Sequence, residues 1–137
     1  MDRQLIEEKL EALRHAVHRI REKCPEHSRD LEGNPDLQDI IAMNLARAVQ
    51  LSVDIAAHLL AASSAPAPAT MADAFEQFHR LGALDRELTD RMKRAVGFRN
   101  IVVPAYEKID WAVVHGICTG RVSDFDSFAR SAERAAR

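Results

Sequence analysis

Residues 34–62 read NPDLQDIIAMNLARAVQLSVDIAAHLLAA and predict one long helix. Asn34 followed by Pro35 is typical of a helix start, because the Asn side chain can cap the first turn and proline is suited to the first helical position. No Gly or Pro interrupts the residues that follow, so the helix is expected to run from Pro35 to about Ala62 and to span roughly 40 Å at 1.5 Å per residue. Its apolar stripe is wide enough to form the spine of a helical bundle. The members of this stripe are Leu37, Ile41, Leu45, Ala48, Leu51, Ile55 and Leu59.

The flanking segments predict further helices around this spine. Apolar residues recur every three or four positions over residues 5–20, with charged residues between them, so this segment predicts an amphipathic helix that Pro25 ends. Residues 63–70, SSAPAPAT, predict a connector, because proline cannot continue a helix. Later helices are predicted to begin at Thr70 with Asp73 as a capping box, near Asp85, at Asp110, and at Ser123 with Asp126 as a second capping box.

The composition is that of one globular domain. Of the 137 residues, 47% are apolar and 29% are charged, whereas a disordered chain would lack the apolar material to offset its ordering entropy. A chain of this length buries about two-thirds of its unfolded surface around a single core. No run of residues alternates as a strand does. We therefore expect a single domain over residues 1–137 that is all-α, an antiparallel bundle of five to six helices.

Charge and the amino-terminal residues narrow the range of partners and locations. The formal net charge of −2 gives no general attraction to a phosphate backbone, so a nucleic-acid contact would depend on a local cluster. The candidate cluster comprises Arg91, Lys93, Arg94 and Arg99. The first residues, MDRQLIEEKLEALRH, carry acids and no uninterrupted apolar core, so they are typical neither of a signal peptide nor of a membrane span. We expect a cytoplasmic protein with no membrane contact.

Cysteine and histidine spacing predicts no metal site. Cys24 and Cys118 lack the paired spacing of a zinc site or a disulfide framework, and we expect inert packing thiols. His15 and His18 share a helix face without a third ligand nearby. Asp54 and His58 lie four residues apart on one face of the long helix. They can line a cleft or hydrogen-bond each other, and the second role is favoured.

Arg99 and Asn100 are the residues best suited to chemistry. They interrupt an otherwise apolar run, residues 96–103, where packing would prefer apolar side chains. An arginine fork can bind a phosphate through two hydrogen bonds, and the adjacent carboxamide can donate to the same oxygens. Gly97 would let another backbone or a ligand approach closely. The alternative that the spacing leaves open is a capped or salt-bridged helix end.

The stretch GFRNIVVPAYEKID, residues 97–110, resembles the signature of the HepT-like branch of the HEPN proteins, the HepT/MntA type of toxin. The family motif is Arg, a polar residue, three more residues, His, any residue, and Tyr. The resemblance covers nearly the whole chain. Residues 44–61 are similar to the family's long second helix, and residues 71–100 are similar to the helical hairpin that follows. The resemblance implies a HEPN-like bundle and a homodimer.

Transferred residue by residue, Arg99 and Asn100 match the Arg and polar positions, Tyr106 matches the Tyr, and Pro104 occupies the position of the family His. The resemblance implies a ribonuclease that needs no metal or other cofactor, with two protomers forming one composite cleft. In such an enzyme the His moves protons while the RNA 2′-hydroxyl attacks phosphorus, and the Arg stabilises the phosphoryl charge. Because proline can perform neither proton step, we expect this chain to be a weak or inactive nuclease.

The resemblance also implies a partner. In the family a nucleotidyltransferase antitoxin of the MntA type transfers AMP to the motif tyrosine, here Tyr106, and the two proteins form a type VII toxin-antitoxin module. The alternative for Tyr106 is a packing aromatic with one satisfied hydroxyl. The alternative for the whole chain, which Pro104 favours, is a non-catalytic module that binds RNA or the nucleotidyltransferase without cutting RNA. A helical scaffold with no nucleic-acid role ranks last.

Overall fold

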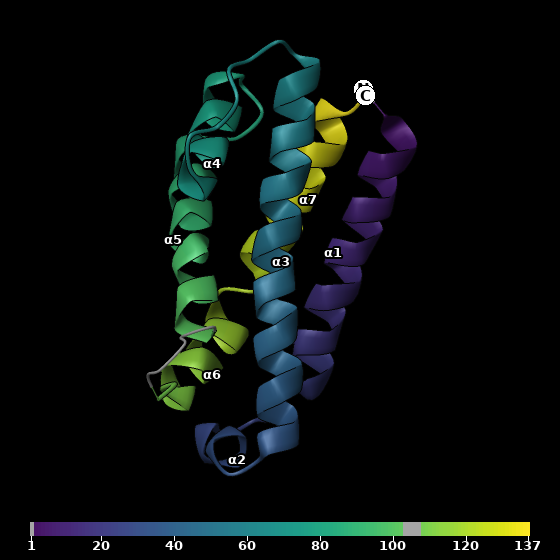
Figure 1. Ribbon diagram of the computed structural model, residues 1–137. Helices are drawn as coiled ribbons and strands as arrows, with labels where there is room; N and C mark the ends of the chain where they lie inside the picture. Colours follow the sequence, from purple (N-terminus) through teal and green to yellow (C-terminus); the bar gives the residue numbers. More distant parts are fainter. Residues whose placement is uncertain (1, 103–107) are drawn as a thin grey trace.

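The computed structural model describes residues 2–102 and 108–137, which form seven helices and no strand (Figure 1). The helices are α1 (Arg3–Lys23), α2 (Ser28–Glu32), α3 (Pro35–Ala62), α4 (Met71–Arg80), α5 (Arg86–Val102), α6 (Trp111–Gly120) and α7 (Ser123–Ala135). The predicted all-α fold is confirmed. The count exceeds the expected five to six because α2 was not predicted.

Helix α3 is the spine of the bundle, with the bounds that the sequence predicted. The Asn34 side chain accepts a hydrogen bond from the Leu37 N–H at 3.2 Å, which caps the first turn. α1, α4, α5 and α7 all pack against α3 (Figure 1). Of the seven stripe residues, Leu37 and Leu51 are partly buried and the other five are fully buried.

By length and composition alone, α3 is also the one helix among the described residues that could cross a membrane. Half of its most apolar 18-residue window is buried inside the bundle. α1, α2, α4, α5 and α7 all pack against α3. The apolar character of α3 is therefore explained by its central place in the bundle.

Polar caps fix most of the other helix starts. Thr70 Oγ1 accepts from the Asp73 N–H at 3.0 Å, and Asp85 Oδ1 accepts from the Leu88 N–H at 2.7 Å. Asp110 likewise caps α6 through the first N–H groups of that helix. These three predicted starts are confirmed, because each side chain satisfies a backbone donor that has no partner inside the helix.

The capping box predicted at the start of α7 is wrong, although the helix does begin at Ser123. The residue before it, Val122, takes the cap position, and no side chain caps the helix there. Asp126 instead pairs with Arg21 of α1. A contact between helices has thus replaced the local hydrogen bond that the spacing predicted.

Helix α2 was missed because five residues are too few to show a helical period. It has no side-chain cap at its start, since His27 makes no capping hydrogen bond. Tertiary contacts hold it instead. Leu31 is fully buried, and Gln38 Nε2 donates to the carbonyls of Leu31 and Glu32, each at 3.0 Å. These bonds occupy carbonyls that the end of a helix would otherwise leave free.

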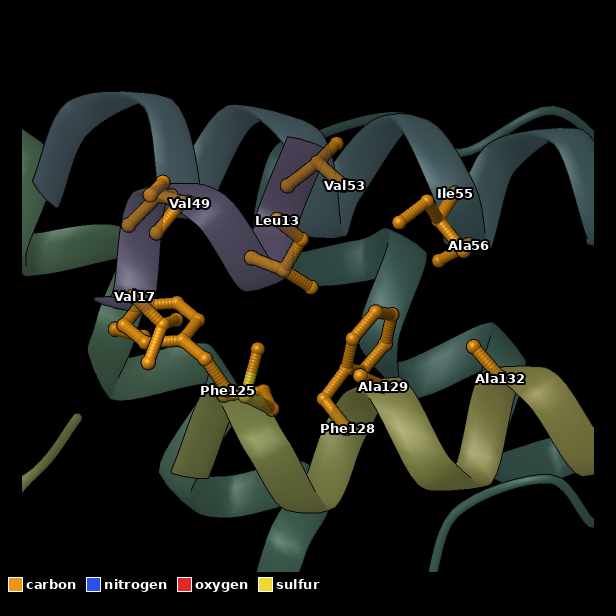
Figure 2. Close-up of a cluster of buried hydrophobic side chains, with 14 of the residues drawn as sticks. Leu13, Val17, Val49, Val53, Ile55, Ala56, Phe125, Phe128, Ala129 and Ala132 are labelled. Atoms are coloured by element: carbon orange, nitrogen blue, oxygen red, sulfur yellow. The ribbon is translucent and has the colours of Figure 1, made fainter. Parts of the chain in front are cut away.

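The core is built around phenylalanines of α4 and α7. Phe75 and Phe128 meet edge to face, with ring centroids 5.6 Å apart and planes at 87°. Figure 2 shows Phe125 and Phe128 pointing from α7 toward side chains of α1 and α3, among them Leu13 and Val49. All five of these side chains are almost completely buried. The core therefore ties α7 to both α1 and α3.

The two ends of the described chain lie together. Arg3 Nη2 donates to the Ala136 carbonyl at 2.7 Å. This bond joins the first turn of α1 to the end of α7 (Figure 1).

Candidate functional site

Arg99 occupies a core-facing position near the end of α5. The buried stripe of this helix is formed by Leu88, Met92, Ala95 and Val102. At 3.6 residues per turn, position 99 falls within the same stripe, between Ala95 and Val102. Arg99 is half-buried, in contrast to the apolar members of the stripe. A charged residue thus occupies a position of α5 at which the pattern of the buried stripe would place an apolar one.

Arg99 lies at the end of the bundle where α6 is found. α3 and α5 run antiparallel, so the end of α5 lies near α6 and beside the amino-terminal half of α3 (Figure 1). Asn100 is exposed. A Cβ added at Gly97 would meet no described atom within 4 Å, so internal packing does not require a glycine there. Among the described residues, none fills the space beside Gly97.

Pro104 and Tyr106 lie outside the described residues. The structure therefore locates the first half of the predicted motif, Arg99 and Asn100, on one helix. The roles of the other two residues stay predictions.

Asp54 and His58 are not brought to Arg99 within one protomer. Asp54 accepts a hydrogen bond from Gln50 Nε2 at 3.0 Å and lies 3.8 Å from Lys9 Nζ of α1. Both residues are in the carboxyl-terminal half of α3, whereas the end of α5 lies beside the other half (Figure 1). The contacts of Asp54 are those of a residue that joins α1 to α3. A cleft-lining role for the pair stays a prediction.

The four residues of the basic cluster predicted from the sequence do not form one patch, because Lys93 and Arg91 contact different helices. Lys93 Nζ donates to Glu76 Oε2 at 3.2 Å, and Arg86 binds both oxygens of the same carboxylate. These hydrogen bonds lower the pKa of Glu76 to about 2. Lys93 therefore belongs to the surface between α4 and α5. Arg91 instead contacts α7, where its Nε lies 3.4 Å from Asp124 Oδ1.

Arg91 and Arg94 contribute to a site that the sequence did not predict. Together with Phe98 of α5, with Arg121 in the turn after α6 and with Asp124 of α7, they line a small cavity of about 40 Å³. We call this site the arginine pocket. Arg121 follows Arg94 by more than twenty residues, so only the packing of α7 on α5 brings the two together. No local spacing in the sequence signals such a contact.

The two cysteines also meet in the structure, although their spacing suggested no relation. Cys24 follows α1 and its thiol donates to the Pro25 carbonyl at 3.6 Å, and Cys118 lies buried in α6, close enough to affect the pKa of Cys24. His115 holds this junction, because its Nε2 lies 2.8 Å from the Pro25 carbonyl oxygen. Burial raises the pKa of Cys24 and raises the pKa of Cys118 to about 12. The Cys118 thiol is thus neutral at pH 7, as expected of a packing thiol.

Within residues 2–102 and 108–137, no group of three or more His, Cys, Asp or Glu side chains is close enough to hold a metal ion.

Comparison with known proteins identifies a family for this chain. The family model described as Ribonuclease HepT-like matches residues 13–132. A curated relative, the mRNA nuclease HepT of Shewanella oneidensis, is 26% identical over 124 residues, which cover 90% of this chain and 92% of the relative.

Solved structures share the fold. A tri-AMPylated HEPN toxin of Shewanella oneidensis, in complex with an MNT antitoxin, superposes with a TM-score of 0.87 at 24% identity and covers 98% of both chains. A toxin-antitoxin crystal structure with AMP-PNP superposes with a TM-score of 0.88 at 23% identity, over 96% of this chain and 98% of the other. The bundle is therefore the same in arrangement from end to end.

Proposed function

The chain belongs to the HepT-like family of ribonucleases, and from this premise we propose that it is the toxin component of a type VII toxin-antitoxin module, a HEPN protein that acts on RNA in the cytoplasm. The observation that supports this proposal is the placement of Arg99. Arg99 is half-buried near the end of α5, in a stripe that is otherwise apolar. An arginine at such a position can bind a phosphate through two hydrogen bonds.

The chemistry that we propose is transesterification within RNA. The 2′-hydroxyl loses its proton and attacks the adjacent phosphorus, and the bond to the 5′-oxygen of the next nucleotide breaks as that oxygen gains a proton. Arg99 stabilises the negative charge that builds on the phosphoryl oxygens, and Asn100 donates a further hydrogen bond. Pro104 supplies no proton transfer. Cleavage by this chain is therefore expected to be slow, because general acid-base catalysis is worth about 10²–10⁴-fold in rate.

The test is cleavage of a labelled single-stranded RNA by purified protein. Arg99→Ala is expected to lower the cleavage rate by about 10²–10³-fold, because it removes the group that stabilises the phosphoryl charge. Arg130→Ala is the matched control, since Arg130 is an exposed arginine of α7 that hydrogen-bonds only its neighbour Ser127 among the described residues. Cleavage that persists unchanged in Arg99→Ala would contradict the proposed role.

A second candidate function is favoured by the proline in the motif. A protein that has lost the proton-transfer residue but kept Arg99 and Asn100 would bind RNA without cutting it. The same assay separates the two candidates. RNA binding that depends on Arg99, with no cleavage above the Arg99→Ala background, supports the binding module.

We further propose that two copies of the chain form a homodimer in which the Arg99 ends of both bundles share one cleft. Two exposed apolar side chains support this arrangement. Met43 is 58% exposed on the amino-terminal half of α3, and Val113 is 46% exposed on α6, so both lie on helices that flank the end of α5. If light scattering shows that the chain is a monomer in solution, the proposal of a shared cleft is wrong.

The proposed partner is a nucleotidyltransferase antitoxin, and Tyr106 is its proposed target. AMP on this tyrosine would add bulk and negative charge to the motif that contains Arg99. When the chain is incubated with such an enzyme and ATP, we expect AMP addition by intact-mass spectrometry, and Tyr106→Phe is expected to abolish it. Because Tyr106 is the only tyrosine of the chain, modification that persists in Tyr106→Phe would place the acceptor on another residue type.

A further inference from the structure

The arginine pocket is a second cluster of positive charge on α5, distinct from Arg99. Arg91, Arg94 and Phe98 are spaced by three and four residues, so they share one face of the helix. Arg99 lies about 100° further around the helix axis than Phe98. The pocket thus begins one residue away from the motif but opens on a different side of α5.

The interior of the pocket is largely buried, and its positive and negative charges do not balance. Asp124 has a side chain only 13% exposed, and burial raises its pKa although Arg91, Arg121 and Arg94 act in the opposite direction. Asp124 Oδ2 and Arg91 Nε are buried and have no hydrogen-bond partner in the part of the chain that the structure describes. Three guanidiniums therefore surround one buried carboxylate, and the pocket keeps an excess of positive charge.

Two of the arginines have no carboxylate partner among the described residues. Arg91 is committed to Glu87, to which it donates at 2.9 and 3.0 Å, and to Asp124. Arg94 and Arg121 are exposed, and within residues 2–102 and 108–137 neither forms an ion pair with a carboxylate. Because both arginines line the pocket and are exposed to solvent, an anion that enters the pocket can accept hydrogen bonds from them.

The size of the pocket limits the ligands that it can hold. A volume of about 40 Å³ is far below the roughly 300–1,000 Å³ of a site that encloses a small organic ligand. It therefore suits a single phosphate group rather than a nucleotide. Phe98 also lines the pocket and is partly buried, and its exposed part offers an apolar surface on which a neighbouring base can stack.

We propose that the arginine pocket binds a backbone phosphate of single-stranded RNA, separate from the phosphate that Arg99 contacts. The proposal rests on the proposed function, because it takes RNA as the substrate. Arg94 and Arg121 bind the phosphate oxygens, Arg91 and Asp124 hold the walls of the pocket, and Asp124 limits the affinity by competing with the phosphate for the guanidiniums.

The test measures the Kd of the full-length chain for a labelled single-stranded RNA over a series of salt concentrations. The double variant Arg94→Ala/Arg121→Ala is expected to weaken binding about tenfold at low salt, since it removes charged hydrogen bonds. The slope of log K against log salt is expected to fall by about 0.7 for the phosphate contact that is lost. Asp124→Asn keeps the shape but removes the competing charge, and is expected to tighten binding several-fold.

Arg130→Ala is the matched control, because it removes a charge from α7 outside the pocket. It is expected to leave both Kd and the salt slope unchanged, with circular dichroism confirming the fold of each variant. The proposal is overturned if the double variant retains the wild-type Kd and slope, as it would if the pocket served a protein partner, or if Asp124→Asn weakens binding. Failure of the proposed nuclease activity gives a different result. RNA cleavage would then be absent, while substitutions at Arg99 and in the arginine pocket would still weaken RNA binding.

Discussion

Pro104→His is expected to raise the rate of RNA cleavage by about 10²–10⁴-fold over the chain with proline. The exchange restores an imidazole at the motif position from which the family resemblance implies proton transfer to or from the reacting oxygens. The expected rate also acquires a dependence on pH near 6–7, because an unperturbed imidazole titrates at about 6.5. The measurement is single-turnover cleavage of labelled RNA from pH 5 to 9.

Two control variants separate proton transfer from backbone effects. Pro104→Ala removes the proline ring without adding an acid or a base, so it is expected to leave the rate at the level of the proline chain. The double variant Pro104→His/Arg99→Ala is expected to lose most of the gain, since the phosphoryl charge would lack its arginine. An equal gain in Pro104→Ala and Pro104→His would show that the restored imidazole is not the cause.

Phe128→Ala is expected to lower the free energy of unfolding by about 3–5 kcal/mol, a large share of the stability of a domain of this size. The ring of Phe128 is fully buried, and its centroid lies 5.6 Å from that of Phe75 and 6.0 Å from that of Phe78. Truncation therefore leaves a cavity where α4, α7 and the spine α3 meet. Urea denaturation followed by circular dichroism measures the change.

The control for this substitution is an apolar residue outside the core. Leu81 is 46% exposed, so Leu81→Ala is expected to cost less than about 1 kcal/mol. If Phe128→Ala cost no more than Leu81→Ala, the aromatic cluster would not be the main tie between α7 and the bundle.

Local signals in the sequence predicted the elements that local interactions determine. The bounds of α3 follow from Asn34, Pro35 and an uninterrupted apolar stripe, and the starts of α4, α5 and α6 follow from side chains that cap their own helices. Arg99 was identified for the same reason, since a charged residue within a helical apolar stripe is visible in the sequence. Its half-buried position agrees with that interpretation.

Features that depend on contacts between distant segments were not predictable from one sequence. The five residues of α2 are held by Leu31 and by hydrogen bonds from Gln38, and Asp126 binds Arg21 rather than its own helix. The arginine pocket likewise exists only because Arg121 packs beside α5. Such contacts carry no periodic signal, so only the folded chain reveals them.

The hydrogen bond between Arg3 and the Ala136 carbonyl has a practical consequence for engineering. Because it holds the first and last helices together at the end of the bundle away from α6, a tag or reporter fused to either terminus is carried far from Arg99 (Figure 1). Adjacent termini also permit circular permutation. A short linker across them, with new ends opened in the proline-rich connector between α3 and α4, would reorder the chain while leaving every helix intact.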